Sequence, residues 1–140
     1  MRPAEDLLVH RPPMLLLDAV LDHRRDGILA RARVDPGAWY ADARGAMPAW
    51  FGLELMAQAI AAYGGLNRRA QDREPRLGYL LGTRAYTCTL PAFPAGSELG
   101  IHAELKYLDD SGLSAFACGI TLDGEEVATA ILKTFEGERP

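Results

Sequence analysis

The sequence predicts an α+β protein in which an antiparallel sheet wraps around one long central helix. Three observations lead to this prediction. The segment 47–65, "MPAWFGLELMAQAIAAYGG", is almost entirely apolar or small and is long enough for several helical turns. Two segments with strand character precede it, and four follow it. A helix that is apolar on every face must be covered by the rest of the protein, and a curled antiparallel sheet provides that cover.

The composition is that of a globular protein, with 49% hydrophobic and 24% charged residues among 140. A chain of this length forms one domain, 1–140, with a substantial core. The formal net charge of −4 argues against a nucleic-acid-binding surface. Cys88 and Cys118 have neither a metal-binding spacing nor a neighbouring histidine cluster. We therefore expect no metal site, no cofactor and no disulfide framework.

The first ten residues, "MRPAEDLLVH", contain acids and no long apolar run, so no signal peptide is visible. Glu54 and Gln58 interrupt the central helix and argue against a membrane span there. A cytoplasmic protein is the default expectation.

The predicted elements follow in chain order. Residues 4–10 can form a short helical turn, which the prolines after His10 end. A strand-like run, 14–23, leads through the turn "DHRRDG" into the segment 26–35. That segment alternates as a half-buried strand does, with Ile28, Ala30, Ala32 and Val34 on one side and Leu29, Arg31 and Arg33 on the other.

An irregular loop, "PGAWYADARGAMP", leads into the central helix. Pro48 suits the first helical turn, where its missing N–H is no loss. We expect the helix to run to about Tyr63, because Gly64 and Gly65 are typical of a helix end, and to be followed by a polar connection. The four later strands are predicted at 77–90, 98–108, 113–122 and 126–135, with Asp123–Gly124 as a hairpin turn.

Glu54 and Gln58 are the polar residues of the apolar helix, and their spacing of four places them on one face. Burying an unpaired carboxylate is costly, so we expect Glu54 to be paired, to have a raised pKa, or both. A carboxyl group with a raised pKa is what a general acid needs at cellular pH. The alternative is a structural ion pair with Arg33 or Arg84.

Three stretches give the sequence a family resemblance. "LVHRPPMLLLDAVL" and "MPAWFGLELMAQA" resemble the β-hydroxyacyl-acyl-carrier-protein dehydratases of the FabZ/FabA-like hot-dog family, whose helix reads roughly "MPG-L--E-MAQ". "YLLGTRAYTCTLPAFPAGSEL" is similar to a later strand and turn of the same family. The nearest branch is the aryl-polyene type (ApeP-like), with its "W-ALELMAQ" helix. The resemblance implies the hot-dog fold and dimerisation.

The resemblance also implies an activity, the elimination of water from a 3-hydroxyacyl thioester carried by acyl carrier protein or CoA. In the family a histidine takes the α-proton and the helix carboxylate protonates the departing hydroxyl, with the two groups coming from different protomers. Backbone N–H groups near the helix N-terminus polarise the thioester carbonyl. Glu54 is the matching carboxylate, and Gln58, Met47 and Pro48 match the motif around it as candidate substrate-binding residues.

The sequence departs from the family at the catalytic histidine. The family places it in "GHFP", seven residues before the helix methionine, and counting back from Met47 leads to Tyr40. Tyrosine, with an ordinary pKa of about 10, is a poor base at neutral pH. His10, in the "VHRPP" segment, is the first substitute candidate, and Tyr40 and Asp42 are others; Asp42 could instead contact substrate.

The remaining charged candidates are weaker. His23 lies in a polar turn, and His102 lies on a strand face shared with Gly100 and Glu104, so both are expected to face solvent. A basic cluster lies after the helix and is either a solvated face or a docking patch for an acidic carrier protein: Arg68, Arg69, Arg73 and Arg76.

Three functions remain open. The first is a dehydratase of 3-hydroxyacyl thioesters in fatty acid or polyene/polyketide-type biosynthesis. The second is a hot-dog thioesterase, in which Glu54 activates water. The third is a non-catalytic partner subunit of an active hot-dog dehydratase. The expected assembly is a homodimer or a heterodimer with a related hot-dog protein.

Overall fold

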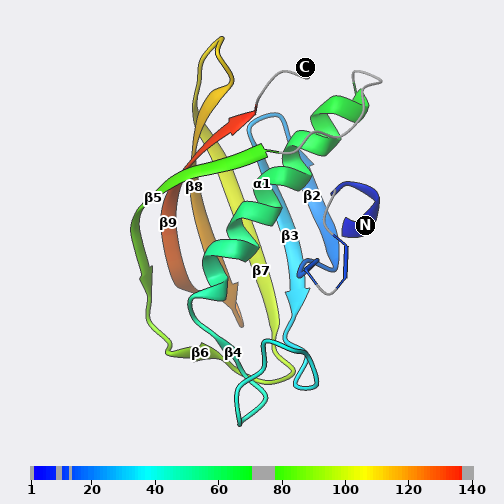
Figure 1. The fold of residues 1–140 in the computed structure, drawn as a ribbon, viewed down its shortest axis with the longest axis vertical. Helices are drawn as coiled ribbons and strands as arrows, with labels where there is room; N and C mark the ends of the chain where they lie inside the picture. The colour runs from blue at the N-terminus through cyan, green and yellow to red at the C-terminus, as the bar shows by residue number, and fades with distance from the viewer. Residues whose placement is uncertain (1, 9–10, 13, 71–77, 137–140) are drawn as a thin grey trace.

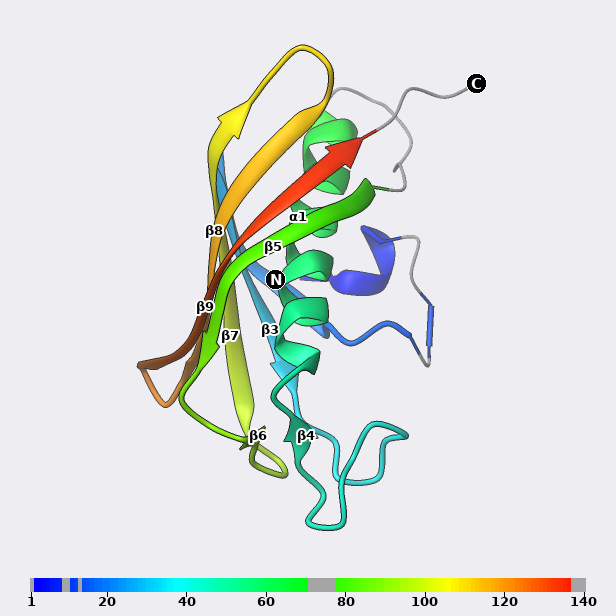
Figure 2. The same ribbon diagram turned by 60° about the vertical axis from the view of Figure 1, so that its left-hand side comes forward.

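The computed structural model describes residues 2–8, 11–12, 14–70 and 78–136. Within them, strands form one antiparallel sheet in the order β1-β2-β3-β7-β8-β9-β5, and two short strands, β4 and β6, pair separately. The sheet curls around helix α1, which lies along its concave side (Figures 1 and 2). The predicted α+β class, with an antiparallel sheet around one central helix, is confirmed.

The elements have the following bounds. The strands are β1 (Arg2–Pro3), β2 (Ala19–Arg24), β3 (Gly27–Arg33), β4 (Met47–Pro48), β5 (Gly78–Cys88), β6 (Ala92–Phe93), β7 (Glu98–Leu108), β8 (Leu113–Leu122) and β9 (Glu125–Glu136). The helices are a 3-10 turn η1 (Ala4–Asp6) and α1 (Phe51–Ala70). The four strands predicted after the helix are confirmed as β5, β7, β8 and β9.

The hairpin turns follow from local backbone chemistry. Asp123 and Gly124 both have positive φ, 53° and 79°, and Leu122 pairs with Glu125 across them. Two consecutive positive φ angles define the tight turn whose twist matches that of antiparallel strands. The Asp-Gly hairpin predicted here is therefore confirmed.

The first of the predicted strands corresponds to β2. It is shorter than predicted, because β2 begins at Ala19 and not near Met14. The backbone N–H groups of Leu16 and Leu17 donate to the side chain of Gln58, so they pair with the helix and not with a neighbouring strand. Periodicity alone could not show this, because the partner lies 41 or 42 residues away in the chain.

The helix starts close to the predicted position, but Pro48 lies outside it and its end comes later than predicted. Pro48 lies in β4, paired with Ala92 of β6, and α1 begins only at Phe51. The predicted end at Gly64 and Gly65 is also wrong, since α1 continues to Ala70. A Cβ on Gly65 would overlap the carbonyl oxygen of Leu7. This glycine therefore permits a close approach of the N-terminal segment and does not end the helix.

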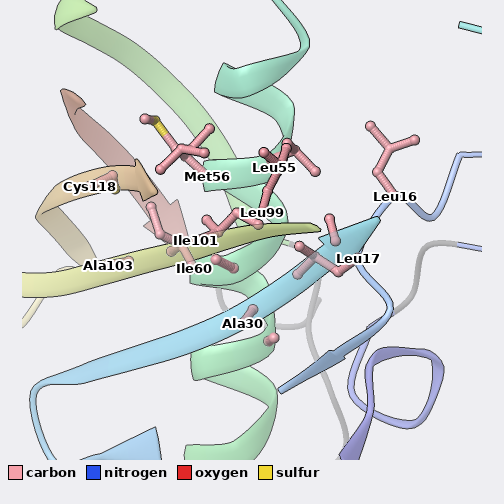
Figure 3. Close-up of a cluster of buried hydrophobic side chains, with 14 of the residues drawn as sticks. Leu16, Leu17, Ala30, Leu55, Met56, Ile60, Leu99, Ile101, Ala103 and Cys118 are labelled. Atoms are coloured by element: carbon pink, nitrogen blue, oxygen red, sulfur yellow. The ribbon is translucent and has the colours of Figure 1, made fainter. Parts of the chain in front are cut away.

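The core lies between the helix and the concave face of the sheet (Figure 3). The predicted alternation of β3 is confirmed, because Ile28, Ala30 and Ala32 are buried while the residues between them are more exposed. Apolar side chains from β7 and β8 and one side of α1 complete the core, among them Leu55, Met56, Ile60, Leu99, Ile101 and Cys118. Burial raises the pKa of the Cys118 thiol to about 12, and neither it nor Cys88 forms a disulfide.

Part of α1 is incompletely covered by the chain itself. Leu53, Ala57, Ala61 and Gly64 are half-buried, and their spacing places them along one face of the helix. At the edge of the sheet β5 pairs with β9 and has no further neighbour among the described strands. In the described part of the chain no helix is long and apolar enough to cross a membrane.

Candidate active site

Glu54 lies in the first turn of α1 and is half-buried. Gln58, one turn later, is 0% exposed, and its Nε2 donates a hydrogen bond to Oε1 of Glu54 over 3.0 Å. The shared helix face expected from their spacing is thus present. The first turn is also where the positive end of the helix dipole stabilises a negative charge.

The N-terminal segment fixes the other contacts of Gln58. Oε1 accepts from the backbone N–H groups of Leu16, at 2.8 Å, and Leu17, at 3.3 Å. Nε2 donates to the backbone carbonyl of Met14, at 2.7 Å. The predicted contact of Gln58 with substrate does not fit this geometry, because the amide is buried and both its ends bind protein groups. Gln58 holds Glu54 instead.

Tyr40 is placed as a structural residue. Its hydroxyl accepts a hydrogen bond from the backbone N–H of Asp35 over 2.8 Å, and its ring packs against Phe51, with centroids 5.8 Å apart. Burial raises the pKa of the Tyr40 phenol above its usual value, with smaller contributions from its surroundings. Raising the pKa of a phenol makes its ionised form scarcer still at neutral pH, which argues against Tyr40 as the general base.

Asp42 organises the loop before the helix. Its Oδ1 accepts from the backbone N–H groups of Arg44, at 2.8 Å, and Ala46, at 3.0 Å. Asp42 is exposed, and side-chain bonds to N–H groups two and four residues later are typical of a turn-forming aspartate. These contacts explain why an aspartate stands at this position, and they require neither of its predicted roles, as base or as substrate contact.

Met47 and Pro48 are both buried, and Met47 pairs with Phe93 where β4 meets β6. The pairing sets the point where the chain enters α1, which in turn sets the position of Glu54. Met47 is only 1% exposed, so its side chain packs inside the protein.

The three histidines lie in different parts of the chain. His10 lies outside the described residues, and so do the side chains of the predicted basic cluster, Arg68, Arg69, Arg73 and Arg76. His23 is exposed and contacts Asn67 Oδ1 over 3.1 Å. His102 bonds to Glu126 over 2.8 Å across the outer face of the sheet. These last two positions agree with the solvent-facing expectation.

Two features around the helix start had no signal in the sequence. The hydroxyl of Tyr86, on β5, donates to the carbonyl of Ala49, and a Cβ on Gly52 would overlap that hydroxyl. Burial raises the pKa of the Tyr86 phenol well above its usual range. The strand that follows the helix is thereby tied to the residues just before the helix start. This contact joins residues 37 apart, and no local pattern could reveal it.

The second feature is a cluster of aromatic rings at the helix start. Phe51 lies 5.5 Å from Trp39 and 6.0 Å from Trp50, between ring centroids. The two tryptophans are 54% and 68% exposed, which is unusual for such large apolar side chains. Trp50 directly precedes α1, so exposed aromatic surface adjoins the start of the helix.

Comparisons with known proteins agree with this architecture. The family model of ApeP-like proteins, the ApeP dehydratase, matches residues 2–140. A solved dehydratase heterocomplex, ApeI:P from Xenorhabdus doucetiae, contains a chain that is 31% identical with a TM-score of 0.92, and the match covers 99% of this chain and 93% of that one.

Two further relatives are more distant. A 3-hydroxyacyl-[acyl-carrier-protein] dehydratase FabZ from Anaeromyxobacter dehalogenans (strain 2CP-C) is 29% identical over 132 residues, 90% of this chain and 83% of that protein. The phenylacetic acid degradation protein PaaI from Thermus thermophilus, solved as a point mutant, has a TM-score of 0.63 at 20% identity, over 86% of this chain and 93% of that one. The PaaI match shows a shared fold alone.

The fold is that of the hot-dog proteins, and the family and relative matches assign the chain to their dehydratase type. Within that class the chain belongs to the ApeP-like dehydratase family, whose model spans nearly its whole length.

Proposed function

We propose that the protein eliminates water from 3-hydroxyacyl thioesters, bound to an acyl carrier protein or to CoA, and that Glu54 is its general acid. The observation that carries the proposal is the Glu54–Gln58 pair, in which a buried amide holds a half-buried carboxylate in the first turn of the central helix. Membership of a dehydratase family supports the same chemistry.

The elimination needs a base and an acid on one substrate. The base removes the proton from the α-carbon, the electron pair of that C–H bond forms the double bond, and the C–O bond at the β-carbon breaks. Glu54 would protonate the departing hydroxyl, so that it leaves as water. Backbone N–H groups at the start of α1 would polarise the thioester carbonyl and stabilise the charge that develops on its oxygen.

The described residues do not supply an evident general base for this site. Tyr40 occupies the position of the family histidine, and its hydroxyl is bonded to Asp35 N–H. The proposal therefore takes the base from elsewhere, either from His10 of this chain or from a histidine of a related hot-dog subunit. The match to a chain of a dehydratase heterocomplex supports the second source.

Two surfaces support assembly with a hot-dog partner or a second copy. The edge of β5, which pairs with no further strand among those described, offers backbone groups for continuing the sheet, and the half-buried face of α1 at Leu53, Ala57 and Ala61 lies open to a second helix. An obligate interface of this kind buries more than about 2,000 Å². Sedimentation of the protein as a monomer at micromolar concentration would contradict it.

One assay tests the activity and separates its alternatives. A 3-hydroxyacyl thioester is given to the isolated protein, to its His10→Ala variant, and to the protein mixed with a histidine-bearing hot-dog dehydratase whose own carboxylate has been replaced. Enoyl absorbance identifies a dehydratase, free thiol identifies a thioesterase, and activity that needs the mixture identifies a base supplied by the partner.

The His10→Ala variant distinguishes the two sources of the base. Loss of activity in the isolated variant assigns the base to His10. Full activity in both the isolated protein and the variant contradicts both sources. If neither the isolated protein nor the mixture releases enoyl product, the dehydratase proposal itself is wrong.

A further inference from the structure

Tyr86 reaches the start of α1 because of an irregularity in β5. Between the β9 partners of Arg84 and Thr87 there is one residue, whereas β5 has two there, Ala85 and Tyr86. Arg84 pairs with Ile131, whose side chain is exposed on the outer face of the sheet. Simple alternation from Arg84 would place Tyr86 on that outer face as well. The extra residue of this β-bulge turns the Tyr86 side chain to the inner face instead, where it packs against the core.

The bulge carries a conformational cost. Ala85 has a φ angle of 53°, a left-handed conformation that is unfavourable for a residue with a Cβ. Such a conformation persists only where the surrounding structure requires it, and bulges of this kind re-aim side chains next to active sites. The contact that this bulge provides is the one between Tyr86 and the start of the helix.

The hydroxyl of Tyr86 helps to fix one peptide group at that point. The carbonyl of Ala49 accepts a hydrogen bond from this hydroxyl and another from the N–H of Gly52 over 3.0 Å. The N–H of Ala49 donates to the carbonyl of Pro91 over 3.1 Å. A Cβ on Gly52 would overlap the Tyr86 hydroxyl, so the glycine leaves room for it. Ala49 is therefore held through both of its backbone polar groups.

The fixed carbonyl sets the direction of the next N–H group. A peptide group is planar, and in its trans form the C=O of Ala49 and the N–H of Trp50 point in opposite directions. Because the carbonyl points toward the N–H of Gly52, further along the helix, the N–H of Trp50 points out of the helix start. N–H groups at this end have no partner within the helix and carry the positive end of its dipole.

We propose that Tyr86 is a positioning residue of the dehydratase site, which aims the N–H of Trp50 at the thioester carbonyl of the substrate. This assignment rests on the proposed function, in which backbone N–H groups at the start of α1 polarise that carbonyl. Negative charge grows on the carbonyl oxygen as the α-proton leaves, so a misdirected donor costs more in the transition state than in the bound substrate. Tyr86 touches no reacting atom, and its effect passes through Ala49.

The sequence allows this peptide group to be observed directly. Tryptophan follows alanine twice, at Ala38–Trp39 and at Ala49–Trp50. Labelling alanine carbonyls with ¹³C and tryptophan amides with ¹⁵N therefore gives two correlated NMR signals, one of which is an internal control. Tyr86→Phe removes only the hydroxyl and should displace the Ala49–Trp50 signal while the Ala38–Trp39 signal stays in place. If the Ala49–Trp50 signal does not move, or if both move equally, Tyr86 does not fix this peptide.

Tyr63 provides a matched control for the loss of a hydroxyl group. Its hydroxyl also donates to a backbone carbonyl, that of Arg25, from the later part of α1. Removing one donor to a developing oxyanion costs about 100- to 1,000-fold in kcat, and misdirecting one should cost at least about tenfold. We therefore expect Tyr86→Phe to lower kcat for a 3-hydroxyacyl thioester by about tenfold or more, with little change in KM. Tyr63→Phe should stay within about twofold of wild type.

Polarisation of the carbonyl can be measured without elimination. Hexanoyl-CoA carrying ¹³C at its thioester carbonyl has no 3-hydroxyl group, and its carbonyl stretching frequency falls when donors polarise the bond. Isotope-edited infrared spectra should show a lower frequency for the thioester bound to wild type or to Tyr63→Phe than in water, and a smaller lowering for Tyr86→Phe. The frequency reports only on bound thioester, so a merely structural loss of folded protein would not change it.

The outcomes separate the positioning role from the dehydratase function. Equal carbonyl frequencies in Tyr86→Phe and wild type would overturn the positioning role, as would equal kcat losses in the two tyrosine variants or a wild type that binds hexanoyl-CoA without lowering the frequency. Wild-type dehydratase activity would stand in each case. If the wild type eliminates no water, alone or with its partner, the dehydratase function fails, and the infrared and NMR experiments still decide the positioning role. A wild type that binds no hexanoyl-CoA, alone or with its partner, would contradict both.

Discussion

Two carboxylate pairs in this protein have similar geometry and different surroundings. Glu54 is bonded to Gln58 over 3.0 Å on the central helix, and Glu126 is bonded to His102 over 2.8 Å on the outer face of the sheet. The His102 and Glu126 side chains are 41% and 48% exposed, whereas Gln58 is entirely buried. The shorter contact belongs to the exposed pair, so distance alone does not distinguish the two pairs.

The difference lies in what each environment does to the same type of group. Water competes with the contact on the outer face, and an exposed contact of this kind contributes about 0–1 kcal/mol. On the helix the partner amide has no access to water, so each of its hydrogen bonds must be made by the protein. A carboxylate with a fixed orientation is useful for chemistry, and burial of its partner is what fixes it.

The largest expected effect is on activity, and it should differ between substitutions of Glu54 and Glu126. Glu54→Gln keeps the shape and removes the titrating proton, so dehydration of a 3-hydroxyacyl thioester should fall by about a hundredfold or more. Glu126→Gln is the matched control on the exposed pair and should stay within about twofold of wild type, since surface substitutions of this kind have small effects. Steady-state kinetics, with the partner present if it is required, would measure both. An active Glu54→Gln variant would move the chemistry to another residue.

The second effect concerns stability. Gln58→Met leaves the buried N–H groups of Leu16 and Leu17 and the carbonyl of Met14 without their partner. We expect the free energy of unfolding to fall by more than about 2 kcal/mol, because each unsatisfied buried group costs about 1–3 kcal/mol. Urea denaturation gives the value. If Gln58→Met lowered the free energy of unfolding by less than His102→Ala does, the buried and exposed pairs would not differ in the expected way.

The third effect compares adjacent glycines of the helix. Gly65→Ala would place a methyl group against the carbonyl of Leu7, whereas a methyl group on Gly64 would meet no atom within 4 Å. We expect Gly65→Ala to destabilise the protein by about 1–3 kcal/mol through overpacking. Gly64→Ala should stabilise it by up to about 1 kcal/mol, since alanine favours the helix. Equal thermal stability of the two variants would mean that the N-terminal segment does not rest on Gly65.

The fourth effect concerns pH and the buried thiol on the inner face. Burial raises the pKa of Cys118 from 9.0 to about 12, so the unfolded chain loses this proton at lower pH than the folded protein does. The contribution is fully present below pH 9 and declines as pH rises towards 12, by about 1 kcal/mol at pH 10. Urea midpoints at pH 8 and pH 10 should therefore differ less in Cys118→Ala than in wild type. An identical difference in both proteins would exclude Cys118 as the cause.

The smallest effect is expected at the exposed pair itself. His102→Ala should lower the free energy of unfolding by less than about 1 kcal/mol, because both side chains are well exposed. A double-mutant cycle with Glu126→Ala isolates the pair energy from other contacts. A coupling above that range would show that the outer face is shielded, as it would be if another subunit covered it.

Much of the fold could be predicted because local patterns carry it. The strands β7 and β8 have the predicted bounds, since clean alternation ended by turn residues defines a strand in its own sequence. The helix is recognisable by its apolar run, and the i,i+4 spacing alone places Glu54 beside Gln58. Motif and periodicity therefore identify the carboxylate and its neighbour.

Tertiary contacts decided what the local patterns got wrong. Gly64 and Gly65 predict a helix end, and yet α1 passes through them. Gly65 instead leaves room for Leu7 of the distant N-terminus. Leu16 and Leu17 have strand character, and their N–H groups bind Gln58 instead. In both cases the deciding partner lies tens of residues away, where no sequence window reaches it.

The amino-acid sequence by itself determined that one apolar helix with a central carboxylate is enclosed by an antiparallel sheet, because hydrophobic periodicity and turn chemistry are local properties. Only the tertiary structure decided which group holds that carboxylate and which residues merely support it. Gln58 is tied to the N-terminal segment, and Tyr40 and Asp42 are tied to the loop before the helix, through hydrogen bonds to backbone groups. Backbone donors and acceptors are the same at nearly every position of the sequence, so only folding shows which of them a side chain meets.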